Sequence, residues 1–200
     1  MRVLIACEYS GTVRDAFAAL GHDAWSCDLL PTESPGRHHQ GDVLTVIHDY
    51  KWDLMVAHPP CTYLCCSGLH WNKRTPGREQ KTTDSIAFVE ALMGAPIQQI
   101  AIENPIGRIS TAIRKPDQII QPWMFGDDAS KATCLWLKNL PRLEPTNVIK
   151  KKRYENQTAS GQNRLGPSPD RWKVRSKTYS GIANAIAAQW SRPEREWRLK

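Results

Sequence analysis

Runs of mostly apolar residues, separated by turns and helical patterns, recur through the first half of the chain. The runs predict buried strands at 3–7, 22–27, 52–57 and 100–102. Residues 13–20, ended by Gly21, and residues 81–93 have apolar side chains on one side, which predicts amphipathic helices. Alternation of strand and helix is typical of an α/β fold with a mostly parallel sheet, right-handed crossovers and flanking helices.

The pattern weakens after Pro105. Residues 119–125 and 133–137 predict two further strands, for which an antiparallel orientation is considered, and residues 182–190 predict a last helix. Residues 150–177 have few apolar side chains and many Gly, Pro and Ser residues, which predicts a long loop. The 200 residues are therefore interpreted as one catalytic domain with a loop or linker before its C-terminal helix.

Positive charge is concentrated in one segment. The chain has 27 Lys and Arg against 20 Asp and Glu, a net charge of +7, and residues 142–177 alone have ten basic residues against three acidic ones. This segment predicts a polyanionic partner, with nucleic acid first, although a solvated loop that aids solubility remains the alternative. The residues expected to contact nucleic acid are Lys150, Lys151, Lys152, Arg153, Arg164, Arg171, Lys173 and Arg175.

Composition narrows the class of protein. A hydrophobic content of 40% with 24% charged residues is typical of a soluble globular protein, and no apolar run approaches the roughly 18 residues of a membrane span. The start of the chain lacks a secretory apolar region, so a cytoplasmic location, no membrane association and reduced cysteines are expected. A zinc site built on Cys61, Cys65, Cys66 and His70 lacks a second ligand pair, so no metal is expected.

Reactive side chains follow two of the predicted strands. Residues 52–57 lead through a Pro-Pro pair to Cys61, and residues 100–102 lead to Glu103. Parallel strands end at one edge of their sheet, where open α/β folds bind ligands, and the two prolines would fix the backbone before the thiol. The pair predicts an enzyme with Cys61 as nucleophile and Glu103 as proton donor. An inert thiol and a structural, ion-paired acid are the alternatives.

Small and acidic residues fall at the ends of other strands. The turn between the first strand and its helix consists of Glu8, Tyr9, Ser10 and Gly11. A glycine here lets the backbone approach a ligand, although a plain turn is the alternative. Asp28 closes the second strand 17 residues after Gly11, close to the spacing of an acid that binds ribose hydroxyls. Asp42 is either a turn cap or a contact for an adenine amino group.

In this order, the motifs resemble those of DNA (cytosine-5) methyltransferases, which bind S-adenosylmethionine on a Rossmann-like sheet. Residues 9–11 resemble the family's Phe-x-Gly-x-Gly turn, Asp28 its ribose-binding acid and residues 41–43 its Gly-Asp-Ile adenine contact. Residues 179–187 resemble the C-terminal Gly-Asn-Ser motif with its helix. The resemblance runs from residue 3 to about residue 190 and implies S-adenosylmethionine as cofactor. The implied cofactor contacts are Glu8, Tyr9, Ser10, Gly11, Asp28, Asp42, Pro59 and Asn184.

The catalytic motifs resemble the same family. Residues 59–61, Pro-Pro-Cys, resemble its nucleophile motif, and residues 103–105, Glu-Asn-Pro, resemble its Glu-Asn-Val motif. The resemblance implies that the Cys61 thiolate adds to carbon 6 of a flipped-out cytosine in DNA while Glu103 protonates or hydrogen-bonds ring nitrogen 3. Carbon 5 then takes the methyl group, a base removes the carbon 5 proton and Cys61 leaves.

The chain departs from the family pattern in three places. Thr12 and Val13 stand where further glycines are expected, and the Gln-x-Arg-x-Arg element has no clean copy. The family's large target-recognition domain is also missing, with only residues 142–177 in its place. Sequence specificity is therefore expected to be low or supplied by a partner protein.

Other functions fit part of the pattern. The same thiol chemistry suits cytosine in RNA or in a free nucleotide. An amino methyltransferase usually has Asp or Asn, Pro, Pro and an aromatic residue, and residues 58–61 lack both the acid and the aromatic ring. A non-catalytic nucleic-acid-binding protein on a degenerate methyltransferase scaffold would need the basic segment but not Cys61.

Overall fold

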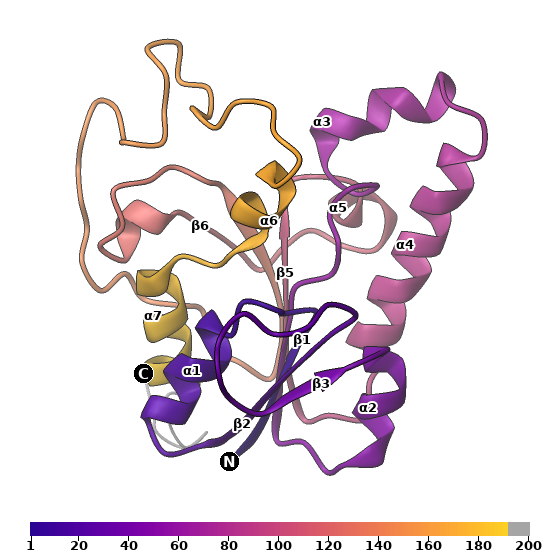
Figure 1. Ribbon diagram of the computed structural model, residues 1–200, viewed down its shortest axis with the longest axis vertical. Helices are drawn as coiled ribbons and strands as arrows, with labels where there is room; N and C mark the ends of the chain where they lie inside the picture. The colour runs from indigo at the N-terminus through magenta and orange to yellow at the C-terminus, as the bar shows by residue number, and fades with distance from the viewer. Residues whose placement is uncertain (192–200) are drawn as a thin grey trace.

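Seven strands form one sheet in the order β3-β2-β1-β4-β5-β7-β6 in the computed structural model, which describes residues 1–191 (Figure 1). The strands are β1 Arg2–Ala6, β2 Asp23–Asp28, β3 His38–Gln40, β4 Leu54–Ala57, β5 Gln99–Pro105, β6 Gln118–Ile120 and β7 Thr133–Lys138. Strands β1 to β5 pair in parallel, whereas β7 is antiparallel to both β5 and β6. This arrangement confirms the predicted α/β fold with a mostly parallel, Rossmann-like sheet.

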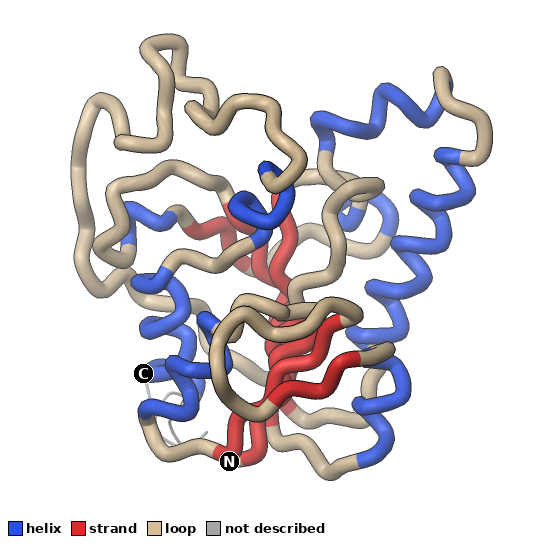
Figure 2. The backbone as a smooth tube through the Cα atoms, in the orientation of Figure 1, coloured by secondary structure: helices blue, strands red, loops and turns tan. Residues whose placement is uncertain are grey.

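Helices cover both faces of the sheet (Figure 2). The α-helices are α1 Thr12–Ala19, α2 Val43–Asp49, α3 Cys66–Leu69, α4 Arg78–Met93, α5 Ile109–Ala112, α6 Arg171–Ser176 and α7 Ser180–Trp190, and the 3₁₀ helices are η1 His70–Lys73 and η2 Pro122–Met124. On one face α1 and α7 bury Phe17, Ile186 and Trp190, and on the other α2 and α4 bury Ile47 and Leu92. Two apolar layers explain why β1 and β4 are apolar without alternation.

Most predicted elements are confirmed, and the main exception is the strand expected over 119–125. It is wrong beyond Ile120, because Pro122 has no N–H for a ladder and begins η2 instead. The strand expected over 133–137 is confirmed as antiparallel β7. The sequence pattern did not predict β3, α2 or α6, and α6 lies within the segment expected to be a loop.

The connections at the carboxyl ends of the parallel strands form the upper half of the molecule in Figure 1. Helices α3 and η1 lie on one side of it, and the long loop after β7 lies on the other. Among residues 1–191 no helix is long and apolar enough to cross a membrane. All six cysteines are free, and no group of three His, Cys, Asp or Glu residues within the described range is placed to hold a metal ion.

Candidate active site

Strands β4 and β5 bring the predicted nucleophile and acid to the same edge of the sheet, because they are adjacent and parallel. Nδ1 of His58 lies 3.1 Å from Oε2 of Glu103. The side-chain amide of Asn104 donates a hydrogen bond to the carbonyl of Pro59 at 2.7 Å. These two contacts fix the segment that leads to Cys61 against the end of β5.

The turn that begins at Cys61 is held from a second side. The carbonyl of Cys61 accepts hydrogen bonds from the backbone N–H groups of Leu64 and Cys65, at 3.0 and 2.9 Å. The carbonyl of Leu64 accepts one from Arg108 at 2.7 Å, and a Cβ on Gly107 would lie only 2.0 Å from that carbonyl oxygen. Position 107 therefore requires glycine, and Cys61 is an exposed residue on a well-supported turn.

The surroundings of Cys61 favour the protonated thiol. Although the residue is exposed, desolvation by the protein around its thiol raises the pKa of Cys61. The neighbouring Cys65 and Glu103 raise this pKa further, whereas the positive charges of Lys131 and Arg175 lower it. Only the thiolate is strongly nucleophilic, so this thiol needs to lose its proton when substrate is present.

In contrast to the Cys61 thiol, Glu103 is ionised at neutral pH. Burial alone would raise the pKa of Glu103, but the hydrogen bond with His58 and the charge of Lys131 outweigh burial and hold the pKa below its usual range. Among residues 1–191, Nε2 of His58 and Oδ1 of Asn104 are buried without a hydrogen-bond partner. Such atoms are usually satisfied by a ligand or water, so the pair points to a place for a polar ligand.

A cavity of about 400 Å³ lies beside the Cys61 turn, at the carboxyl ends of β1 and β2. Its lining includes the predicted cofactor residues Asp28 and Asp42, together with Pro60 and Phe88. Pro59 was expected to contact the cofactor; it is buried, and its neighbour Pro60 lines the cavity. Asp42 also caps α2, with Oδ1 accepting the N–H of Leu44 at 2.9 Å, so both functions considered for it are compatible with its place.

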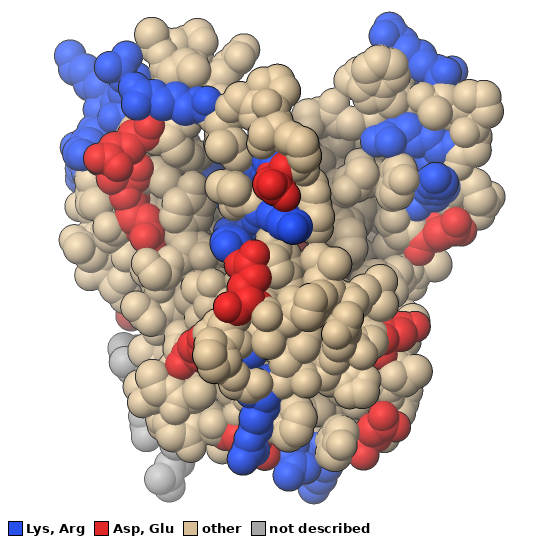
Figure 3. Space-filling model, in the orientation of Figure 1, with Lys and Arg blue, Asp and Glu red and all other residues tan. Residues whose placement is uncertain are grey.

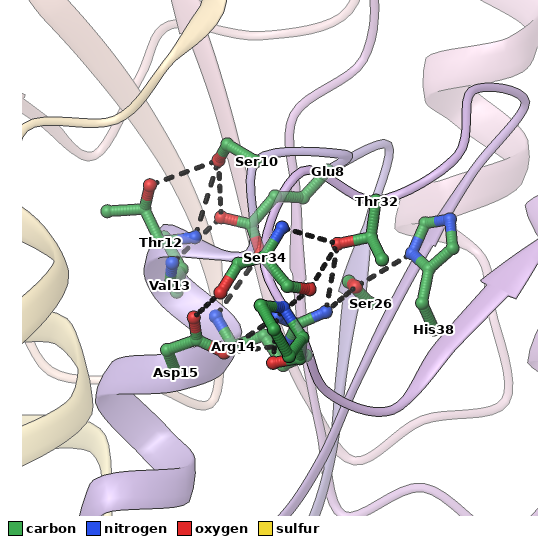
Figure 4. A network of polar contacts seen from close by, with 11 residues as sticks. Glu8, Ser10, Thr12, Val13, Arg14, Asp15, Ser26, Thr32, Ser34 and His38 are labelled. Atoms are coloured by element: carbon green, nitrogen blue, oxygen red, sulfur yellow. Dashed lines mark hydrogen bonds and ion pairs between the residues drawn. The ribbon is translucent and has the colours of Figure 1, made fainter.

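A second cavity, about 450 Å³ and open to solvent, lies between α1 and the loop before β3. It contains none of the predicted catalytic or cofactor residues. The buried guanidinium of Arg14 on its wall already donates to Ser26, Thr32 and the carbonyl of Ser34 at 3.0 to 3.2 Å (Figure 4). The smaller cavity is therefore the better candidate for a cofactor.

The turn after β1 is closed by its own side chains (Figure 4). The buried carboxylate of Glu8 accepts hydrogen bonds from the N–H groups of Val13 and Arg14 at 2.7 and 3.2 Å. Ser10 donates to the same carboxylate at 3.3 Å, and Gly11 has a φ of 77°, which glycine adopts without strain. The carboxylate thus occupies the helix N-terminus at which nucleotide-binding folds hold a phosphate.

Two further residues expected to contact a cofactor lie away from the cavity lining. The hydroxyl of Tyr9 donates to the carbonyl of Lys173 at 2.9 Å and lies 3.1 Å from Oγ of Ser176, so it holds α6 on the turn. Asn184 is exposed on α7. Neither Tyr9 nor Asn184 lines the cavity, nor do Glu8, Ser10 and Gly11.

The residues predicted to contact nucleic acid fall into two groups and a single arginine. The exposed group at 150–153 lies in the long loop after β7, and Arg164 is exposed further along the same loop. The group at 171–175 is on α6, where Nζ of Lys131 donates to the carbonyl of Arg175 at 3.0 Å. Arg175 also acts electrostatically on the Cys61 thiol, so α6 brings residues predicted for nucleic acid close to the predicted nucleophile.

Sequence reasoning missed Lys131 as part of the site. Lys131 stands two residues before the start of β7 and acts electrostatically on both Cys61 and Glu103. A lone lysine before a strand has no signal of its own in the sequence. The tertiary pairing of β7 with β5 places it there.

Comparisons with known proteins add little to this geometry. No family model matches the chain, and a search of curated proteins found no relative. Among solved structures, a candidate DNA modification methyltransferase encoded within a prophage of E. coli is similar at 13% identity, with a TM-score of 0.47. The match covers 74% of this chain and 51% of that one, so this chain spans about half the length of that protein.

The electrostatics predict how fast Cys61 reacts with iodoacetamide. Lys131→Ala should raise the pKa of Cys61 and slow its alkylation at pH 8, whereas Glu103→Gln should lower that pKa and speed it, since the thiolate is the reacting form. Removing one partly exposed charge should change the free energy of thiol ionisation by about 0.5–1 kcal/mol, which corresponds to roughly a two- to fivefold change in the alkylation rate.

Peptide mass spectrometry separates Cys61 from Cys65 and Cys66, which also react. Lys115→Ala, at an exposed lysine outside the site, is the control and should leave the rate unchanged. Equal rates in Lys131→Ala, Glu103→Gln and the control would show that these charges do not act on the thiol.

Proposed function

We propose that the protein is an S-adenosylmethionine-dependent methyltransferase that acts on carbon 5 of cytosine in DNA through a covalent Cys61 adduct. The observation that carries the proposal is that Cys61 and Glu103 lie at the ends of adjacent parallel strands and act on each other electrostatically, next to a cavity that Pro60 lines. Open α/β sheets bind their ligands at this edge.

The cavity suits an adenosyl group with a positive charge. Asp28 can accept hydrogen bonds from ribose hydroxyls, and Phe88 offers an apolar surface to an adenine ring. Cys27 stays neutral on the cavity wall, because burial and the nearby carboxylates of Asp28 and Asp42 raise its pKa to about 12.

The cap on α1 argues against a phosphate-bearing cofactor. The Glu8 carboxylate fills the anion position at that helix N-terminus. S-adenosylmethionine has no phosphate, and its sulfonium, which supplies the activated methyl group, is positively charged. The acidic residues around the cavity therefore favour it over a dinucleotide.

The chain's own residues carry a balanced proton path. In the free protein the proton rests on the Cys61 thiol rather than on Glu103, as the directions of their pKa shifts show. When a cytosine enters, Sγ of Cys61 bonds to carbon 6, and the thiol proton passes through Glu103 to ring nitrogen 3. After carbon 5 has gained the methyl group, a base, either a side chain or water, takes the carbon 5 proton and the S–C6 bond breaks to release the Cys61 thiolate. Nitrogen 3 then returns its proton through Glu103 to the sulfur.

The remaining buried groups orient the two reacting side chains. His58 holds the carboxylate of Glu103 through Nδ1, and Asn104 holds the backbone before Cys61. Oδ1 of Asn104 and Nε2 of His58 stay available to polar atoms of the base. Lys131 stabilises negative charge at both reacting groups.

Methylation of cytosine in RNA or in a free nucleotide is the second candidate. The observation that favours it is the absence of room for a target-recognition domain between β7 and α7, where residues 142–177 form mostly loop. The positive charge of that loop favours a nucleic acid polymer over a free nucleotide, and DNA remains our proposal because the motifs resemble those of DNA methyltransferases. A specificity partner protein would then select the sequence.

The covalent step is tested with DNA that contains 5-fluorocytosine, in which fluorine blocks the final loss from carbon 5. The protein with S-adenosylmethionine should form a complex that survives denaturing gel electrophoresis. Cys61→Ser should abolish the complex, whereas Cys66→Ser, five residues away and also exposed, should not. A complex that persists in Cys61→Ser, or that never forms on DNA, RNA or nucleotide, would refute the mechanism.

Cofactor binding is tested by calorimetric titration with S-adenosylhomocysteine. Asp28→Asn keeps the oxygen that accepts the Leu30 N–H at 3.0 Å but removes the charge offered to the ribose. A hydrogen bond to a charged group is worth about 1.5–3 kcal/mol, so affinity should fall roughly tenfold or more. Glu90→Gln, on the exposed side of α4, is the control and should bind normally. Unchanged affinity in Asp28→Asn would place the cofactor elsewhere.

A further inference from the structure

A second positively charged surface lies across the catalytic edge from the predicted one. Residues 62–81, here called the basic arm, run from the turn after Cys61 through α3 and η1 into α4. The arm has four basic residues against one acidic residue, and the chain outside the arm and residues 142–177 has 13 basic against 16 acidic ones. Net positive charge is therefore confined to these two segments.

The arm combines cations with aromatic rings. The guanidinium of Arg74 lies 5.9 Å from the ring centre of Trp71, and that of Arg78 lies 4.8 Å from the ring of Tyr63. Nζ of Lys81 lies 5.6 Å from the same tyrosine. Trp71 is 47% exposed, which is unusual for a tryptophan without a partner. Aromatic faces beside cationic groups are typical of surfaces that bind phosphates and stack on bases.

Hydrogen bonds hold the arm in place. Oγ1 of Thr82 donates to the carbonyl of Tyr63 at 3.1 Å and accepts from Nδ2 of Asn72 at 2.9 Å. Nη2 of Arg78 donates to the carbonyl of Thr62 at 3.0 Å. These bonds join the start and the middle of the arm to α4, so its charges keep a fixed position relative to Cys61.

The arm and the loop after β7 are opposite walls of a notch. In Figure 3 blue side chains gather over the upper right of the molecule, where Figure 1 places α3, η1 and the start of α4, and over the upper left, where the long loop lies. The surface is hollowed between them (Figure 3). Cys61 directly precedes the arm, so a ligand between the walls lies over the catalytic edge.

We infer that the basic arm is a second nucleic-acid-binding wall, which holds the phosphates of a DNA duplex against residues 142–177. A duplex presents phosphates on both of its sides, which matches two separate basic walls, whereas a free nucleotide needs only one. Trp71 stacks on a base exposed next to the flipped cytosine. The inference rests on the proposed function for the target base but is measurable without catalysis.

The test is fluorescence anisotropy of a labelled DNA duplex at several salt concentrations. The variant Lys73→Gln/Arg74→Gln should bind roughly tenfold or more weakly at about 0.1 M salt, with the slope of log affinity against log salt reduced by about 1 to 2. The matched control Lys51→Gln/Lys115→Gln removes two exposed lysines outside both segments and should lose less than twofold. Circular dichroism checks that each variant is folded.

Trp71→Ala separates stacking from charge. It should weaken binding severalfold and leave the salt slope unchanged, because no phosphate contact is lost. The inference would be overturned if Lys73→Gln/Arg74→Gln had the same affinity and salt slope as the control. The arm would then be a candidate surface for a protein partner. If the 5-fluorocytosine adduct still formed in that case, the proposed function would stand while the second wall would not. If Lys73→Gln/Arg74→Gln lost affinity but the unmodified protein formed no adduct, the second wall would stand and the proposed function would fail.

Discussion

The arrangement of the site depends on one buried hydrogen bond, from the amide of Asn104 to the carbonyl of Pro59 at 2.7 Å. Strands β4 and β5 bring their ends together, but two prolines after β4 have no N–H with which to continue the ladder. The Asn104 amide replaces that ladder contact and sets where Cys61 stands relative to Glu103. Leaving either buried group unpaired would cost about 1–3 kcal/mol.

The charge around the same sheet edge changes sign from one part to another. Glu8 closes the helix N-terminus of α1 with a carboxylate, and Asp28 and Asp42 add negative charge around the neighbouring cavity. Farther out, at the basic arm and the long loop after β7, the net charge of the chain is positive instead. A cationic cofactor and an anionic polymer can therefore approach the thiol from different sides without competing for the same charges.

The central strands and the meeting of Cys61 with Glu103 could be predicted because apolar runs mark buried parallel strands, whose ends share an edge. The position of Lys131 could not, since it depends on the antiparallel pairing of β7. Tyr9 was expected at the cofactor but holds α6, because no periodicity encodes side-chain directions within a turn. Helix α6 is too short to give a helical pattern.

The most direct test of the account is the identity of the methylated base. DNA is incubated with the protein and S-adenosylmethionine and digested to nucleosides. The nucleosides are separated by liquid chromatography, identified by mass spectrometry and compared with standards. A thiol nucleophile paired with Glu103 predicts 5-methylcytosine. N4-methylcytosine or N6-methyladenine would show that an amino group is the acceptor and that Cys61 is not a nucleophile, which would contradict the account.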